Sequence, residues 1–102
     1  MIQVKAKTDI AALGELLIDF TPAGNSQQGM RLFEQNPGGA PANMLAAAAK
    51  FGLKTAFIGK VGRDMHGDFL KETLVKAGIN TENLIQDDKY FTTLAFVSLK
   101  EN

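Results

Sequence analysis

The stretch that decides the fold is Asn-Pro-Gly-Gly-Ala-Pro-Ala-Asn, residues 36–43. Two adjacent glycines, Gly38 and Gly39, remove both side chains at one point, so the backbone there can take positive φ and approach another molecule closely. Pro41 suits the first turn of a helix, where its missing N–H costs nothing. The pattern predicts a Gly-Gly turn leading into a helix, whose unpaired N–H groups favour oxygen-rich ligands, either hydroxyls or anions.

A polar side chain, Asn43, follows one turn inside this predicted helix, among apolar residues. Its amide can bind a polyhydroxyl ligand or make a structural hydrogen bond to a neighbouring loop, and the residues alone leave both interpretations open. Four consecutive alanines come next, with Lys50 in the last turn and Gly52 as the C-terminal stop. We expect a buried helix over residues 41–51 whose alanines allow close approach to a sheet.

The composition excludes several classes of function. The chain has 102 residues, of which 45% are hydrophobic and 22% charged, as in one small globular domain. Basic and acidic residues both number 11, so we expect neither nucleic acid nor anionic membrane as a partner. The absence of cysteine excludes disulfides, thiolate zinc sites and cysteine nucleophiles. We see no segment with the apolar length of a signal peptide or membrane span, and we expect a cytoplasmic protein.

Two apolar runs, residues 9–13 and 16–20, are separated by a glycine and a glutamate. They predict one buried strand that is covered on both faces, as in parallel sheets flanked by helices. Asp19 lies near the end of this strand, just before the Thr-Pro-Ala-Gly sequence of residues 21–24. A carboxylate in that place contacts ligands in open α/β sheets or begins a turn, and the residues alone favour the turn.

The remaining elements follow from periodicity and from glycine and proline positions. We predict a loop over residues 23–30, a short half-exposed strand over 31–35, a strand over 54–60, a helix over 65–77 closed by Gly78, a short strand around 83–85, a long strand over 91–100 and a turn starting at residue 101. Glu72 and Lys76 are expected to pair on the solvent side of the second helix. The alternation of strands and helices predicts an α/β fold with a mostly parallel sheet.

Three further features have ordinary structural interpretations. Gly59, Gly62 and Gly67 lack the spacing of a dinucleotide or P-loop motif, so we interpret them as strand-to-helix turn geometry. Asp64 is expected to cap the second helix. His66 is the only histidine and has no partners for a metal site, so we interpret it as a surface helix residue.

Taken in order, residues 14–19, residues 37–43, the alanine-rich helix and residues 57–67 resemble the ribokinase-like (PfkB) carbohydrate kinases. The Gly-Gly-Ala-Pro-Ala-Asn sequence looks most like the fructokinase branch. This resemblance implies a ribokinase-like (Rossmann-like), mostly parallel sheet with flanking helices, plus β-strands of a lid that closes over the sugar. The lid strands would be residues 31–35 and 91–100, and a homo-oligomer formed through them is expected.

The resemblance also assigns roles to individual residues. The positions matching Asp19, Gly38, Gly39 and Asn43 hold sugar hydroxyls in that family. Phe96, on a predicted lid strand, is expected to cover the sugar. The resemblance thus reverses the interpretation of Asp19 as a turn residue and favours ligand binding for Asn43.

One departure from the family pattern matters for catalysis. The family carries a Gly-Ala-Gly-Asp motif, which supplies the general base and an anion hole, in its C-terminal half, and residues 1–102 contain no such motif. We therefore expect this chain to be the N-terminal portion of a single ribokinase-like domain, inactive alone, with no catalytic, nucleotide or metal site. ATP and Mg²⁺ are implied by the resemblance, with their sites outside the chain.

The expected reaction is ATP-dependent phosphorylation of fructose at its 6-hydroxyl, and 2-keto-3-deoxygluconate and ribose are the alternative sugars. A hypothesis from another class is a non-catalytic module that binds sugar or assembles through its lid strands. Turnover by the isolated chain would separate the two.

Overall fold

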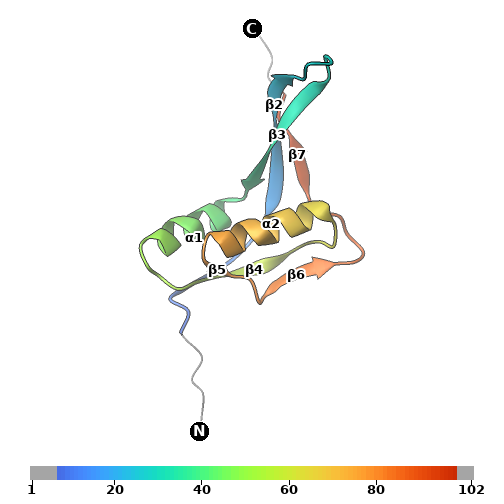
Figure 1. Ribbon diagram of the computed structural model, residues 1–102. Coiled ribbons are helices and arrows are strands. Elements are labelled where there is room, and N and C mark those ends of the chain that lie inside the picture. The colour runs from blue at the N-terminus through green and yellow to red at the C-terminus, as the bar shows by residue number, and fades with distance from the viewer. Residues whose placement is uncertain (1–6, 99–102) are drawn as a thin grey trace.

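The computed structural model describes residues 7–98. Its elements, in chain order, are β1 (Ile10–Leu13), β2 (Leu17–Asn25), β3 (Arg31–Gly38), α1 (Ala40–Lys50), β4 (Thr55–Gly62), α2 (Met65–Lys76), β5 (Ile79–Asn80), β6 (Leu84–Asp87) and β7 (Leu94–Phe96). They form two sheets, and the two helices belong with the larger one (Figure 1).

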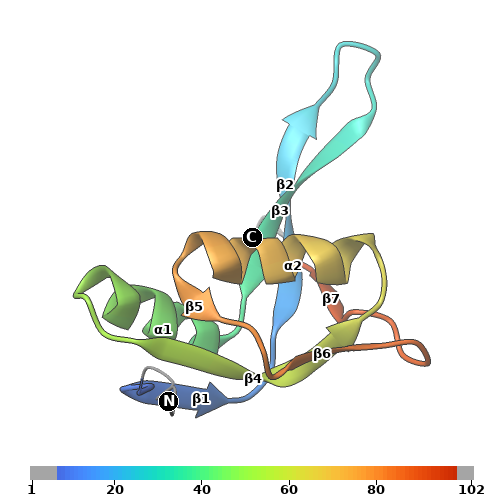
Figure 2. The same ribbon diagram turned by 60° about the horizontal axis from the view of Figure 1, so that its bottom comes forward.

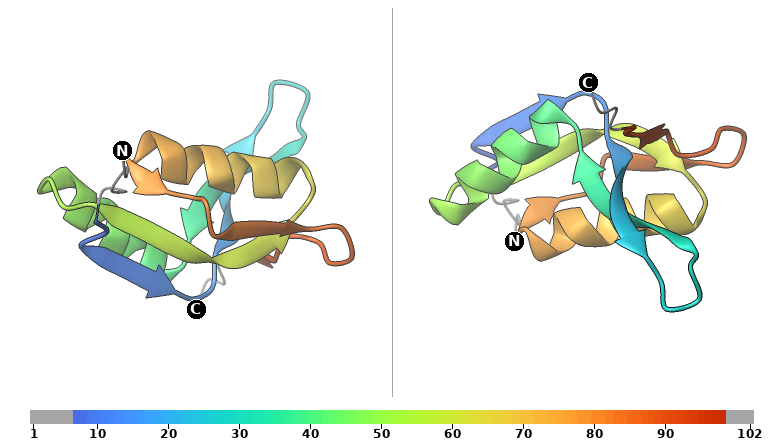
Figure 3. Two further views of the ribbon diagram at one scale, coloured as in Figure 1. Left: turned by 90° about the horizontal axis from the view of Figure 1, so that it is seen from below. Right: turned by 90° about the horizontal axis from the view of Figure 1, so that it is seen from above.

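The larger sheet is parallel and is organised around β4. Strand β1 pairs with one edge of β4, while β5 and β6 pair with the first and second halves of its other edge. Both helices lie on the same face of this sheet (Figure 3). We call this sheet with its two helices the α/β layer. The predicted α/β fold with a mostly parallel sheet is confirmed.

The smaller sheet, which we call the lid sheet, contains β3, β2 and β7 in that order. Strand β2 is antiparallel to β3 and parallel to β7. The sheet rises from the α/β layer, and the hairpin of β2 and β3 projects furthest from the helices (Figures 1 and 2). Strands β3 and β7 lie within or over the two ranges for which the resemblance predicts lid strands.

The core lies between the parallel sheet and the helices. Its largest fully buried side chains are Phe57 from β4, Leu45 from α1, Leu70 from α2 and Ile18 from β2. Burying a side chain of this size stabilises a fold by roughly 1.5–3 kcal/mol. Because Ile18 belongs to the lid sheet, the base of the lid sheet is part of the same core.

Residues 9–20 form two strands in different sheets, so the prediction of one buried strand is wrong. The chain leaves the parallel sheet at Gly14, whose N–H donates to the Ile58 carbonyl at 3.2 Å. A Cβ on Gly14 would overlap the ring of Pro41, so the link between β1 and β2 passes against the start of α1. Both halves are apolar, and periodicity therefore did not reveal the break. As a result Asp19 is the third residue of β2, near the beginning of a strand and not near its C-terminal end.

The predicted coverage of β1 on both faces is also wrong for residues 7–98. Ala12 and Phe57 lie in the core, whereas Leu13 and its partner Ile58 lie on the other face and are exposed. The helix α1 is likewise buried on one side only, since Met44 is half exposed. The apolar composition correctly predicted that β1 and α1 contribute to a core, but it did not show which of their faces are covered by another element.

The lid hairpin is longer than predicted. Strand β2 continues through the expected breaker to Asn25, with a register shift after Pro22. Strand β3 continues to Gly38 across Pro37. A proline is tolerated there because β3 is an edge strand and needs no N–H on its free side. The predicted loop over 23–30 is therefore reduced to a tight turn after Asn25.

The last strand is shorter than predicted. A strand was predicted over 91–100; within residues 91–98 strand β7 covers only 94–96, and residues 99–100 lie outside the described residues. Thr92 is buried, and its backbone and side chain bind Asp64 instead of extending the β ladder. The predicted turn start at residue 101 lies outside the described residues.

The helix ends follow the predictions closely. Asp64 caps α2 by accepting a hydrogen bond from the Gly67 N–H at 2.7 Å, and Gly78 follows the helix with φ 82°. Gly52 follows α1 with φ 86°. The Glu72–Lys76 pair is present at 3.2 Å. Among residues 7–98, no helix is long and apolar enough to cross a membrane.

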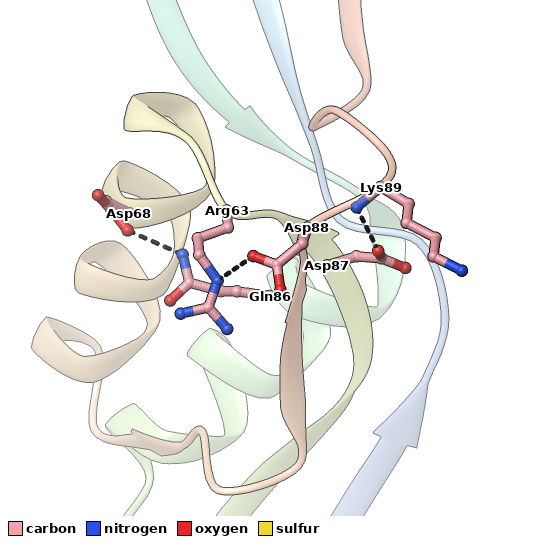
Figure 4. Close-up of polar contacts among 6 residues, drawn as sticks. All are labelled: Arg63, Asp68, Gln86, Asp87, Asp88 and Lys89. Carbon is pink, nitrogen blue, oxygen red and sulfur yellow. Dashed lines mark hydrogen bonds and ion pairs between the residues drawn. The ribbon is translucent and has the colours of Figure 1, made fainter.

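Polar contacts attach β6 to α2 and to the loop after β4 (Figure 4). Gln86 donates from Nε2 to Asp68 Oδ1 at 2.8 Å, and Arg63 pairs with Asp88 at 2.6 Å. Both members of the ion pair are exposed, so the pair contributes about 0–1 kcal/mol. These contacts hold the sheet edge but lie away from the candidate site.

Candidate functional site

Two chain segments cross closely where the candidate site lies. A Cβ on Gly39 would overlap the carbonyl oxygen of Glu15, and Gly39 has φ 117°, which favours glycine. Gly39 is the N-cap residue of α1 and supplies no side-chain cap. The first N–H groups of α1 are therefore not occupied by a capping side chain. The fold itself requires glycine at this position.

Gly38 makes room for the Asp19 carboxylate. A Cβ on Gly38 would overlap Asp19 Oδ2 and would lie 3.1 Å from Leu17 Cδ1. The Asp19 side chain thus rests against bare backbone. Among the described residues no lysine, arginine or histidine forms an ion pair with it. The structure brings these two predicted site residues into direct contact and leaves a negative charge beside the start of α1.

Asp19 shares one face of the lid sheet with Asn36 and Ala95, which are its partners in β3 and β7. Asn36 Nδ2 donates to Thr21 Oγ1 at 3.0 Å and to the Asp19 carbonyl at 3.3 Å. This polar face, formed by Asp19, Thr21, Asn36 and Ala95, was not predicted. Only the strand register brings these residues together.

Asn43 lies in the second turn of α1 and is exposed. With Pro37 and Gly38 it lines a mostly apolar hollow between α1 and α2. Within residues 7–98 its side chain makes no hydrogen bond to a neighbouring loop; its backbone N–H donates to the Gly39 carbonyl at 3.2 Å. The structure therefore places Asn43 and Gly38 along the same hollow, and among the described residues the Asn43 amide makes no hydrogen bond.

Phe96 lies on the face of the lid sheet opposite Asp19. It is in register with Phe20, and the two rings stack with centroids 4.9 Å apart. Phe33 meets Phe96 edge to face at 5.7 Å. We call these three rings the aromatic face. The structure does not bring Phe96 and the Asp19 carboxylate together, because neighbouring residues of a strand point to opposite faces.

A hydrogen-bonded junction ties β7 to the α/β layer. Asp64 Oδ2 accepts from the Thr92 N–H at 2.9 Å, and Oδ1 accepts from the Thr92 hydroxyl at 2.7 Å. Burial raises the pKa of Asp64, but hydrogen bonds from Thr92 and Gly67 lower that pKa by more in total, so the net pKa is lowered. Gly62 and Gly67 permit this junction, because a Cβ on either would overlap neighbouring backbone. Their role is close packing at the start of α2.

His66 is not simply a surface residue, so that interpretation is wrong. It is partly buried, and its Nδ1 lies 3.3 Å from Nε2 of Gln35. A glutamine amide nitrogen only donates, so Nδ1 accepts in this contact. The imidazole also meets Phe20 edge to face at 5.8 Å. Sequence reasoning missed these contacts because they join residues far apart in the chain.

The described residues hold no group of three or more histidines, cysteines, aspartates or glutamates that could bind a metal ion. Three oxygen-bearing side chains do converge on one face of the lid sheet, and only one of them, Asp19, is acidic. The other two are Thr21 and Asn36. Such a face suits hydroxyl groups better than phosphate, since a carboxylate repels an anion.

Comparison with known proteins decides the family. Residues 7–102 match the family described as pfkB family carbohydrate kinase. The chain belongs to the pfkB carbohydrate kinase family. The resemblance inferred from the motifs is confirmed, and so is the ribokinase-like fold class, which is shared with the solved fructokinase structures of this family.

Individual relatives of this pfkB chain are fructokinases. Fructokinase-2 of Oryza sativa subsp. japonica is 45% identical over 95 residues, which are 91% of this chain and 28% of the rice protein. The fructokinase structure from Xylella fastidiosa superposes with a TM-score of 0.82 at 41% identity, over 89% of this chain and 28% of that one. The chain thus spans less than a third of the length of these relatives.

A third relative carries ligands. The fructokinase of Vibrio cholerae O395, in its form with fructose, ADP and a calcium ion bound, superposes with a TM-score of 0.75 at 34% identity. The match covers 90% of this chain and 28% of that one.

Proposed function

We propose that this chain carries the sugar-binding part of an ATP-dependent sugar kinase that phosphorylates fructose at its 6-hydroxyl. The observation that supports it is the Asp19 carboxylate resting on the bare backbone of Gly38, beside the uncapped start of α1. A sugar hydroxyl both donates and accepts hydrogen bonds, so it suits a site that offers a carboxylate acceptor next to N–H donors.

In this proposal each residue has a distinct role. Asp19 accepts hydrogen bonds from sugar hydroxyls, and Gly38 and Gly39 let the ring approach the backbone. Asn43 orients the sugar through its free amide. Ala95 is the β7 residue on the face of Asp19, so it borders the ring, while Phe96 supports the strand from the aromatic face.

The rest of the reaction lies outside residues 1–102 in this proposal. ATP as donor, Mg²⁺ and the catalytic base would be held by other segments, with the chain forming the N-terminal portion of a single ribokinase-like domain. The Vibrio cholerae relative with fructose, ADP and calcium supports a nucleotide and a metal for the complete protein. We further propose a cytoplasmic protein that forms homo-oligomers through its lid strands.

Fructose is favoured over 2-keto-3-deoxygluconate and ribose because the rice, Xylella and Vibrio relatives are named fructokinases. A non-catalytic sugar-binding or assembly module is the second candidate. It is favoured by the absence of a Gly-Ala-Gly-Asp motif from the 102 residues. Sugar-dependent ADP release by the isolated chain would rule out the second candidate, and we expect none.

The sugar site is tested with Asp19→Ala in the complete gene product that carries this chain. We expect fructose affinity to fall by about 1.5–3 kcal/mol, the range for hydrogen bonds to a charged group, which is roughly 10- to 150-fold. Calorimetric titration with fructose, ribose and 2-keto-3-deoxygluconate measures the loss and ranks the sugars. Glu82→Ala, which removes an exposed carboxylate between β5 and β6, is the matched control. Unchanged fructose binding by Asp19→Ala would remove Asp19 from the site.

A further inference from the structure

The start of α2 contacts β2 and β3 of the lid sheet and the segment just before β7. Asp64 binds Thr92, two residues before β7 begins. His66 meets Gln35 of β3 through Nδ1 and Phe20 of β2 through its ring edge. A lid sheet held at one strand could pivot about that strand, whereas these contacts also restrain the other two strands.

The two contacts differ in strength. The Asp64–Thr92 junction contains two hydrogen bonds to a carboxylate, and Thr92 is buried. The His66–Gln35 contact is a single hydrogen bond of 3.3 Å between partly buried side chains. Hydrogen bonds to a charged group are stronger than those between neutral groups. The first contact therefore acts as a fixed anchor, and the second breaks at lower cost.

We propose that His66 and Gln35 form a latch that holds the lid sheet in its sugar-binding position. This inference rests on the proposed sugar site. Gln35 is in register with Phe20, and the next residue of β2 toward the layer is Asp19. A shift of β2 at the latch therefore moves the carboxylate relative to Gly38 and the start of α1. His66 and Gln35 are positioning residues, since they act on the sugar through Asp19.

Three substitutions separate the parts of the latch. His66→Phe keeps a ring beside Phe20 but removes the acceptor for Gln35. His66→Asn keeps an acceptor near the place of Nδ1 but removes the ring. Gln35→Ala removes the donor and leaves the imidazole. Met65→Ala is the matched control, because Met65 belongs to the same turn and is 76% exposed.

Lid position is measured directly, without sugar, in the complete gene product. Spin labels are placed at Gln27→Cys in the exposed hairpin turn and Lys71→Cys on α2, with any other cysteine of the gene product replaced. We expect a narrow distance distribution in the parent and in Met65→Ala. His66→Phe and Gln35→Ala should broaden it, and the double variant should broaden it no further. His66→Asn should restore most of the narrow distribution.

Sugar kinetics on the same variants supply the second readout. We expect the KM for fructose to rise roughly three- to tenfold in His66→Phe and Gln35→Ala, as for the loss of one neutral hydrogen bond, while kcat changes less than twofold. His66→Asn should recover the parent KM. A purely structural role would lower kcat through loss of folded protein and would not be rescued by His66→Asn.

The outcomes distinguish the latch from the sugar-kinase proposal. An unchanged distance distribution in both His66→Phe and Gln35→Ala overturns the latch, whatever the kinetics. A broadened distribution with unchanged KM overturns its role in sugar binding. If the parent binds no sugar, the sugar-kinase proposal fails and the positioning role fails with it, while a broadened distribution would still establish the mechanical contact. Gln35 belongs to an edge strand, so we expect Gln35→Ala to fold. That variant therefore still tests the latch if His66→Phe does not fold.

Discussion

The α/β layer and the lid sheet differ in how far they bury phenylalanine side chains. Phe57 in the layer is fully buried between a sheet and two helices, whereas Phe96 in the lid sheet is 64% exposed. No helix among the described residues covers the lid sheet, so its rings stack on one another along one face. Its other face carries Asp19 and the side chains around it. The layer thus supplies most of the core and the start of α1, and the lid sheet supplies the carboxylate of the candidate site.

The two regions meet at tight polar and glycine contacts. Ile18 is the lid residue that enters the layer's core, and Asp19, the next residue, faces the site. Gly39 lets the link before β2 pass against α1, while Asp64 attaches β7 to α2. Because the lid sheet has no core of its own, the geometry of the candidate site depends on how the lid sheet is anchored to the α/β layer.

The largest effect should come from emptying the core of the layer. Phe57→Ala is expected to destabilise the fold by about 3–5 kcal/mol, because it removes a fully buried ring and leaves a cavity. Denaturant unfolding of the chain measures the loss. Phe51→Ala, at a ring that is 85% exposed, is the control and should change stability by less than about 0.5 kcal/mol. Similar losses in both variants would contradict the placement of the core.

An intermediate effect should come from the junction between the regions. Both carboxylate oxygens of Asp64 accept hydrogen bonds, from the N–H groups of Gly67 and Thr92 and from the Thr92 hydroxyl. An asparagine amide or a protonated carboxyl would have a donor in place of one of these acceptors, and that donor would face another donor. Because asparagine is as good an N-cap as aspartate, the loss should come from the bonds of Thr92, and we expect Asp64→Asn to cost about 1.5–3 kcal/mol at pH 7, as for hydrogen bonds to a charged group. Unfolding curves of both proteins provide the measurement.

The same residue predicts a pH dependence. Its pKa is lowered in the folded state, so its stabilisation is present above the ordinary aspartate pKa and is lost as pH falls through the lowered value. The stability difference between the parent and Asp64→Asn should therefore shrink on acidification from pH 7 toward pH 2. A gap that stays constant over this range would show that the carboxylate charge does not contribute.

The smallest effect should come from the aromatic face. Phe96→Ala removes one stacked and one edge-to-face contact, each worth about 0.5–1.5 kcal/mol beyond area burial. Because the ring is largely exposed, we expect global stability to fall by only about 1 kcal/mol. Amide exchange should quicken at Val97, whose N–H donates to the Phe20 carbonyl at 2.9 Å, and stay unchanged in β4. A destabilisation as large as that of Phe57→Ala would show that the aromatic face, and not only Ile18 at the base of the lid sheet, is part of the main core.

Sequence patterns were most accurate where the determining interaction is local. The cap at Asp64, the stops at Gly52 and Gly78 and the Glu72–Lys76 pair all involve residues within four positions of one another or of a helix end. Sequence patterns gave wrong predictions where two apolar segments follow each other with no change in the period of their apolar residues. The strands β1 and β2 are such a case, because burial in either sheet produces the same apolar run.

The candidate site shows the same division. The ordered motifs identified Asp19, Gly38, Gly39 and Asn43 as a set. The structure brings Asp19 against Gly38, and Asn43 lines the same hollow as Gly38. The motifs did not show that Phe96 lies on the opposite face, nor that His66 reaches the lid sheet. These facts depend on strand register and on a contact across 31 positions of the chain.

By itself the sequence determined the family, the α/β class and the glycine pair, because two adjacent positions without side chains and an ordered set of motifs are local properties of the chain. Tertiary structure alone decided which partners those residues meet. A one-residue change of register would exchange Ala95 for Phe96 on the face of Asp19, since side chains alternate along a strand. The pairing of β2 with β3 and β7, and its anchoring by α2, therefore fixes what the site presents to a ligand.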